Sequence, residues 1–177
     1  MARSVAAHLD RLDPEAARQA LTRCCGSKRW VEGMLARRPF RSDPQLFSAA
    51  DEIWQALAPE DWLQAFSHHP RLGDRRIEAS APEATRAWSK AEQSGAAGAS
   101  GKIRDALAAG NAAYERRFGH VFLLCATGKS GEEMLAELRR RLDRDPREEL
   151  LTAAGEQAKI TRLRLAKLAE DDSRREV

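Results

Sequence analysis

The chain has 177 residues, of which 42% are hydrophobic and 32% are charged, and its net charge is +3. This length and composition are typical of one globular domain with a single core. Acidic and basic residues are interleaved, so a pI near 9.0 does not indicate a nucleic-acid surface, which needs clustered basic residues. No apolar run approaches the ~20 residues of a membrane span. We therefore expect neither nucleic acid nor a membrane as a partner.

The ends of the chain and its cysteines favour a cytoplasmic location. The first ten residues lack the apolar centre of a secretory signal, and the last three are not a peroxisomal tripeptide. Cys24 and Cys25 are adjacent and Cys125 is distant, a spacing that fits neither a disulfide framework nor a zinc site. We expect three reduced cysteines and no metal.

Helix start and stop signals divide most of the chain into helices. Asp-Pro pairs open three of them, at Asp13, Asp43 and Asp145, because aspartate is a favoured N-cap and proline fits the first helical position. Ser130 with Glu133 has the spacing of a capping box. The predicted helical segments, in chain order, are 13–26, 28–38, 42–57, 58–66, 80–95, 100–119, 130–142 and 145–170.

Two stretches do not have a clear helical pattern. Residues 120–126, HVFLLCA, suit either a short extended piece or the buried start of another segment, and residues 93–101 suit either a mobile loop near a site or a plain connection. Nowhere do several strands with period-two alternation appear. The expected fold is all-α, a single-domain bundle of about eight helices over residues 1–177.

The histidine pair in FSHHPRLGD is the first candidate for chemistry. The chain has four histidines, and two of them are His68 and His69. Pro70 keeps His69 out of the helical conformation, and an imidazole held in a stiff turn can exchange a proton near neutral pH. The alternative is a structural pair of histidines in an ordinary loop.

Three further segments have side chains that could serve a site. On a helix, Glu92 shares a face with Trp88 and Ser89, which favours either a desolvated carboxyl group or an amphipathic helix with Glu92 in water. NAAYERRFGHVF ends a helix at Gly119, after which peptide groups could bind a polar ring. KITRLRL offers arginines for a carboxylate, although surface arginines are common. The segment ATGKS, residues 126–130, resembles the end of a phosphate-binding loop. That motif needs a glycine five residues before Gly128, and position 123 is leucine, so the motif is excluded.

Together these segments resemble the OHCU decarboxylase family, where OHCU is 2-oxo-4-hydroxy-4-carboxy-5-ureidoimidazoline. HHPRLGD, SKAEQSG, NAAYERRFGHVF and KITRLRL follow the order and approximate spacing of that family, from about Leu21 to Leu168. The resemblance implies an all-α, cofactor-free and usually homodimeric enzyme. Its implied reaction removes CO2 from OHCU and gives (S)-allantoin at the end of urate degradation in purine catabolism.

The resemblance also implies the roles of individual residues. His69, the histidine before proline, would be the catalytic acid-base, and Glu92 would be the essential glutamate that positions the substrate. The implied substrate-binding residues are Pro70, Ser89, Gln93, His120, Val121, Phe122, Leu123, Leu124 and Arg164, with Arg162 as the alternative to Arg164. His120 departs from the apolar or aromatic residue that is common there in relatives.

The chemistry fits a protein without a cofactor, because a ring C=N of OHCU can accept the electron pair that CO2 leaves behind. Two rival functions stay open. One is a cofactor-free isomerase or hydratase acting on a related ureido or keto acid through the same histidine and glutamate. The other is a helical interaction or regulatory protein that keeps the pocket without turnover.

Overall fold

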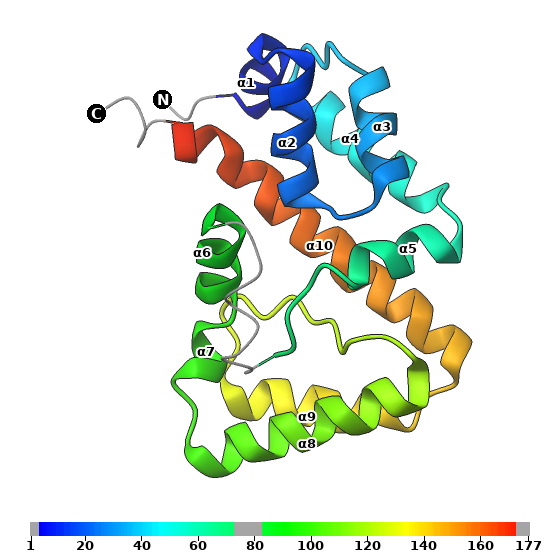
Figure 1. Ribbon diagram of the computed structural model, residues 1–177, viewed down its shortest axis with the longest axis vertical. Coiled ribbons are helices and arrows are strands. Elements are labelled where there is room, and N and C mark those ends of the chain that lie inside the picture. The colour runs from blue at the N-terminus through cyan, green and yellow to red at the C-terminus, as the bar shows by residue number, and fades with distance from the viewer. Residues whose placement is uncertain (1–3, 73–82, 173–177) are drawn as a thin grey trace. The chain divides into compact units, whose positions relative to one another are not determined.

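The computed structural model describes residues 4–72 and 83–172, where the chain forms ten helices and no strand (Figure 1). The prediction of an all-α fold is therefore confirmed. The side chains of residues 83–87 and 170–172 are outside this description. The helices are α1 (Val5–Arg11), α2 (Pro14–Cys24), α3 (Lys28–Ala36), α4 (Asp43–Gln55), α5 (Pro59–Phe66), α6 (Glu83–Glu92), α7 (Ser94–Ala97), α8 (Gly101–Phe118), α9 (Gly131–Leu142) and α10 (Pro146–Asp172).

Contacts divide the chain into two compact units, which we describe separately. The first unit consists of the residues up to Ala65 and those from Ala158 onward, and the second is Phe66–Gln157. Helix α10 thus contributes its N-terminal part to the second unit and the remainder to the first. A single domain over residues 1–177 stays a prediction.

The eight predicted helices are present, and α1 and α7 are additional. Helix α1 has Ser4 as its N-cap, whose Oγ accepts from Ala7 N. The Asp43 carboxylate accepts further hydrogen bonds from Ser4 Oγ (2.7 Å) and Ala6 N (2.8 Å). The prediction that Asp43 caps α4 is wrong. Ser42 is that cap, accepting from Gln45 N, and Asp43 is the first helical residue.

Large aromatic and aliphatic side chains fill the first unit. The Trp30 indole on α3 is fully buried, and its Nε1 donates to Ala50 O on α4 at 3.1 Å, so the bulkiest core residue has its polar atom satisfied. Helix α2 ends at Cys24, two residues before the predicted stop at Gly26, and Cys25 is extended. Leu21, Met34, Leu46 and Leu165 are also fully buried in this unit.

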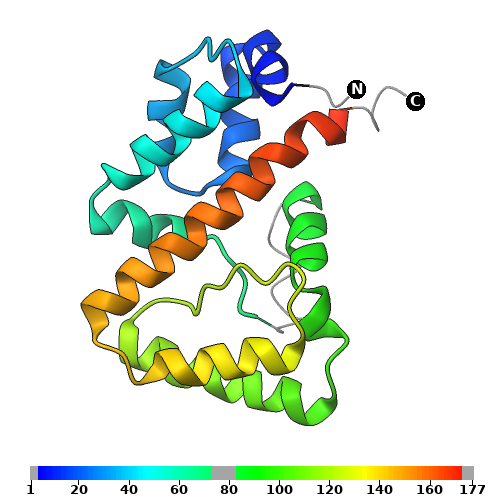
Figure 2. The same cartoon turned by 180° about the vertical axis from the view of Figure 1, so that it is seen from behind.

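Helices α8 and α9 form the base of the second unit and lie side by side in both views (Figures 1 and 2). Gly110 permits their close approach, because a Cβ at this position would stand 2.4 Å from Leu138 Cδ2. The core of the unit contains Leu72, Ala96, Leu107, Tyr114, Phe122, Leu124, Ala126, Met134, Leu135 and Leu138.

An irregular segment connects α8 to α9. Gly119 ends α8 with a φ of 75°, the left-handed conformation that favours glycine. From there the chain has neither helix nor strand until Ser130, whose capping box with Glu133 starts α9 as predicted. Residues 120–126 have neither helix nor strand, and Phe122, Leu124 and Ala126 enter the core.

The glycine-rich connection after α6 is packed against its neighbours. It contains α7, in which Ala96 is fully buried, and Ala99 is 8% exposed. A Cβ on Gly131, at the start of α9, would stand 2.5 Å from Ala99 Cβ. The connection therefore packs closely against the start of α9. Over residues 4–172, apart from the gap at 73–82, no helix combines the length and apolar character that crossing a membrane requires.

Candidate active site

The histidine turn, residues 67–72, follows directly after α5. His69 N donates to Phe66 O at 3.0 Å, which turns the chain out of the helix. His68 is exposed and His69 is half-buried, so the two neighbouring imidazoles have different surroundings. Residues 73 and 74, the end of the quoted motif, lie outside the described residues.

Helix α8 holds the histidine turn at two points. The Arg71 guanidinium donates to both carboxylate oxygens of Glu115, from Nε at 2.6 Å and from Nη2 at 2.8 Å. Asn111 is buried and its Nδ2 donates to Leu72 O at 2.9 Å. These bonds fix the backbone on the C-terminal side of His69, which limits the directions in which its ring can point.

The ion pair between Arg71 and Glu115 should make a pH-dependent contribution to stability. Hydrogen bonds from Arg71 hold the pKa of Glu115 below its ordinary value of 4.5. A carboxyl group with a lowered folded-state pKa stabilises the fold above its unfolded pKa, and this stability is lost as the pH falls through the folded-state pKa. The side chains are 49% and 24% exposed, so Glu115→Gln should lower the free energy of unfolding by only about 0.2–1 kcal/mol at neutral pH.

Urea unfolding of wild type and Glu115→Gln at about pH 7 and about pH 3 measures this contribution. We expect the difference between the two proteins to be smaller at the lower pH, because protonation of Glu115 in the folded state removes the ion pair. An equal difference at both pH values would contradict the assignment.

Gln157 on α10 is the residue that orients the His69 ring. Its Oε1 lies 2.7 Å from His69 Nε2, and Gln157 is fully buried. An amide oxygen only accepts hydrogen bonds, so Nε2 is the donor in this contact. The sequence analysis did not find Gln157. The sequence feature that could have indicated Gln157 is its position as a polar residue on an apolar helical face, with Ala153, Ala154 and Ile160, which are buried.

The end of α6 places a carboxylate in a buried position. Glu92, its last residue, is 8% exposed, and Trp88 one turn earlier is 7% exposed. Ser89 and Gln93 are half-buried. Of the two alternatives for this helix, Glu92 is thus not on the solvated face. The predicted helix start at Ser80–Pro82 lies outside the described residues, and α6 is described from Glu83.

The 120–124 segment lies beside the histidine turn, since the rings of Phe66 and His120 are 5.3 Å apart; Figures 1 and 2 show the two stretches of chain passing each other. His120 also contacts the rings of Tyr114 and Phe118. Burial lowers the pKa of His120, which favours the neutral ring. Phe122, Leu123 and Leu124 are 2%, 3% and 7% exposed. Their peptide groups, more than their side chains, are therefore suited to contact a ligand.

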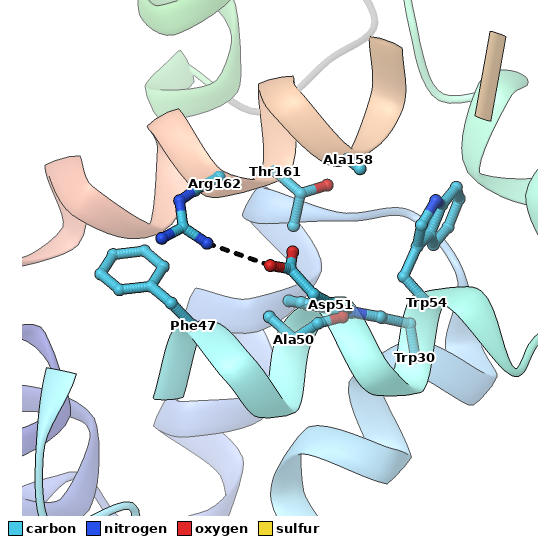
Figure 3. Close-up of a pocket in the computed structure, with 8 residues that line it drawn as sticks. All are labelled: Trp30, Phe47, Ala50, Asp51, Trp54, Ala158, Thr161 and Arg162. Carbon is cyan, nitrogen blue, oxygen red and sulfur yellow. Dashed lines mark hydrogen bonds and ion pairs between the residues drawn. The ribbon is translucent and has the colours of Figure 1, made fainter. Parts of the chain in front are cut away.

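The two arginines of KITRLRL belong to the first unit, whereas the residues described above belong to the second. Arg164 is 4% exposed and its Nη1 donates to Arg23 O at 3.4 Å. Arg162 is exposed, pairs with Asp51 at 3.1 Å, and lies over the Phe47 ring beside a small hollow (Figure 3). Because Arg162 is exposed and already paired with Asp51, it is less suited than Arg164 to bind the carboxylate of a buried ligand. Arg164 as the substrate arginine stays a prediction.

The cysteines and acidic residues give no metal centre in the described part of the chain. No three histidine, cysteine, aspartate or glutamate side chains gather there as ligands. Burial raises the pKa of Cys25 to about 12, so this thiol stays protonated. All three cysteines are thiols, and Cys125 is half-buried.

The second unit thus combines an oriented imidazole with a buried carboxylate on an all-helical frame. These are the parts that general acid-base enzymes use. Side chains of α8 hold the histidine turn that carries the imidazole. The 120–124 segment lies beside this turn. The class of protein to which these features point is an all-helical enzyme.

Comparisons with known proteins specify the family. The family model described as OHCU decarboxylase matches residues 10–166. The uric acid degradation bifunctional protein TTL of Arabidopsis thaliana is 38% identical over 151 residues, which are 85% of this chain and 47% of that protein. The putative 2-oxo-4-hydroxy-4-carboxy-5-ureidoimidazoline decarboxylase of Homo sapiens is 36% identical over 141 residues, 77% of this chain and 79% of that protein.

Solved structures agree with the family match. A crystal structure of OHCU decarboxylase in the presence of (S)-allantoin superimposes with a TM-score of 0.72 at 33% identity, covering 90% of this chain and 99% of that one. A structure of (S)-allantoin synthase has a TM-score of 0.63 at 19% identity, which shows a shared fold. The chain therefore belongs to the OHCU decarboxylase family, whose class of enzyme is the carboxy-lyases. It spans about half of the Arabidopsis protein, 47% of its length.

Proposed function

We propose that this protein decarboxylates OHCU to (S)-allantoin in urate degradation, without a cofactor. Family membership supplies the reaction. The observation that carries the proposal on this chain is His69, a half-buried imidazole with Nε2 held 2.7 Å from Gln157 Oε1. An imidazole held in a defined direction is what proton transfer to or from a bound substrate requires.

The reaction needs proton transfer and a defined orientation of the substrate. The bond between the carboxylate and its ring carbon breaks, and its electron pair moves toward the neighbouring ring C=N, whose nitrogen takes up a proton. An enol-like intermediate and CO2 result. The hydroxyl proton then leaves as C=O forms, and a proton is added to the carbon that bears the ureido group. One proton is consumed for each carboxylate lost, and addition from one face gives a single enantiomer.

His69 and Glu92 have the two catalytic roles in this proposal. His69 takes the hydroxyl proton, or polarises that hydroxyl as CO2 leaves. Glu92 accepts hydrogen bonds from the ring or ureido nitrogens and positions the intermediate. Its burial, with 8% exposed, supports this role because hydrogen bonds to a carboxylate are stronger away from bulk water.

The remaining contacts of the proposal orient the substrate. Peptide groups of the 120–124 segment would bind its ring, a role supported by the burial of the Phe122, Leu123 and Leu124 side chains. Ser89 and Gln93, both half-buried, would line the pocket beside Glu92. Pro70 would form its wall at the histidine turn, and Arg164 would pair with the carboxylate. A homodimer in the cytoplasm is the proposed working form.

Circular dichroism of the product tests the activity. OHCU is unstable, so it is generated in the cuvette from urate with urate oxidase and hydroxyisourate hydrolase, and the protein is then added. We expect rapid growth of the signal of a single allantoin enantiomer. Slow formation of racemic allantoin, unchanged by the protein, would overturn the proposal, because spontaneous decay of OHCU also gives allantoin but without a preferred enantiomer.

A further inference from the structure

The 120–124 segment lacks the usual means by which a backbone is held in place. It has neither helix nor strand. Within the described part of the chain, its residues make no backbone–backbone hydrogen bond. An irregular segment next to a candidate active site must keep one conformation if its peptide groups are to bind a ligand. Side chains from other elements must therefore hold it.

Arg141 on α9 contacts this segment in two ways. Its Nη1 donates to Leu123 O at 2.7 Å, and its guanidinium lies over the Phe122 ring, 4.6 Å from the centroid. Arg141 is fully buried. The planar guanidinium donates along fixed directions and stacks on an aromatic face at the same time, which an ammonium group cannot do. It thus fixes both the carbonyl direction and the adjacent ring.

Glu149 and Tyr114 hold Arg141 in turn. Arg141 Nε donates to Glu149 Oε1 at 2.7 Å, and the Tyr114 hydroxyl donates to the same oxygen. The Tyr114 ring meets the Phe122 ring edge-on, with centroids 5.2 Å apart. Burial, and then the hydrogen bond to Glu149, raise the pKa of Tyr114, so its hydroxyl remains a donor. The three side chains come from α8, α9 and the first turn of α10 and form one buried network.

Stability alone does not explain this network. Taking two charges out of water is costly, and apolar residues of similar volume often replace a buried ion pair without loss of stability. Glu149 Oε2 is buried and has no hydrogen-bond partner among the described residues, so the network is not fully satisfied. Apolar side chains would fill this space at a lower desolvation cost. They would not supply a directional bond to Leu123 O.

A second side chain holds the same segment from its other end. Cys125 N donates to Glu156 Oε2 on α10 at 2.7 Å. The bonded carbonyl of residue 123 and the bonded amide of residue 125 flank Leu124. The two peptide planes around Leu124 are therefore fixed by two different helices, α9 and α10.

We propose that Arg141, held by Glu149 and Tyr114, is a positioning residue that keeps the backbone of residues 122–124 in the conformation in which its peptide groups bind the substrate. The positioning role rests on the proposed function, because the proposed function names the substrate that these peptide groups bind. Arg141 acts through the peptide groups and touches no reacting atom. Loss of the network should weaken substrate binding and facial selectivity while the proton chemistry of His69 continues.

The apolar triple variant Arg141→Met/Glu149→Leu/Tyr114→Phe separates positioning from stability. We expect an unfolding midpoint near that of wild type, since both charges are removed together. We expect kcat/KM to fall by about 10²-fold, mainly through KM, with a mixture of allantoin enantiomers and an unchanged pH dependence of kcat. Arg140→Met is the matched control, because Arg140 is the exposed neighbour that pairs with Glu137, and it should retain wild-type kinetics.

A second variant and a second measurement keep the outcomes distinct. Arg141→Lys retains the charge beside Glu149 but loses the planar group over Phe122, so it should show the same rise in KM. This variant replaces the triple variant as the test if the triple variant does not fold. Amide hydrogen exchange at Leu124 and Cys125 should be faster in either folded variant than in wild type. Wild-type kinetics, product enantiomer and exchange in a folded variant would overturn the proposal. If wild type itself has no activity, the proposed function fails, and the exchange rates alone decide whether Arg141 holds the segment.

Discussion

His69→Asn is expected to lower kcat/KM for OHCU by about 10²–10⁴-fold, the range typical of a lost general acid-base group. Asparagine is similar in size and can still form a hydrogen bond with Gln157, which lies 2.7 Å from the imidazole in wild type. It cannot exchange a proton near neutral pH. His69 is half-buried, and the turn that carries it is held by Arg71 and Asn111. The unfolding midpoint should therefore remain close to that of wild type.

The neighbouring histidine provides the matched control for this experiment. His68 has the same side chain in the same turn but is exposed, so His68→Asn should keep the wild-type rate and product enantiomer. Allantoin formation is followed by circular dichroism for both variants. Full activity in His69→Asn, or an equal loss in both variants, would show that His69 is not the acid-base group.

Glu92→Gln is expected to lower kcat/KM by about 10²-fold. The substitution conserves shape but removes the negative charge, and a buried carboxylate makes stronger hydrogen bonds to N–H groups than a neutral amide does. Glu92 is 8% exposed at the end of α6. If Glu92 stabilises the intermediate, the loss falls on kcat; if it only binds the substrate, the loss falls on KM. Steady-state kinetics with OHCU generated in the cuvette separates the two.

The control for Glu92→Gln is the same substitution at an exposed glutamate. Glu132 in the first turn of α9 is exposed, and Glu132→Gln should retain wild-type kinetics. Urea unfolding of Glu92→Gln is measured beside the kinetics, so that a loss of activity at an unchanged unfolding midpoint can be assigned to the site. A stable Glu92→Gln variant with wild-type kcat and KM would remove Glu92 from the mechanism.

The helices could be predicted from the sequence where their signals are local. Asp13 caps α2, Ser27 caps α3, Ser100 caps α8, and Ser130 forms its capping box with Glu133. In each case the bonded groups are two or three residues apart, so the chain need only fold locally for the cap to form. The order of helices and the all-α class followed from these signals.

Elements that depend on remote contacts were missed or misassigned. At the start of α1, the cap Ser4 and the amide of Ala6 both donate to Asp43, 39 and 37 residues away in sequence. The same contact explains why Asp43 is not the cap of α4. Helix α7 forms in a stretch of small residues whose burial against α9 replaces intrinsic helix propensity.

For the candidate site, the sequence by itself determined the chemical groups and their order along the chain: a histidine before proline, a glutamate one turn after a tryptophan, and a glycine-ended helix. Tertiary structure alone decided their partners. Gln157 reaches His69 across 88 residues, Glu115 reaches Arg71 across 44, and Glu149 reaches Tyr114 across 35. Side chains so far apart leave no periodic signal, because their contact depends on the packing of whole helices. Local spacing determines a cap or a turn, whereas the orientation of a catalytic ring depends on which helices pack against it.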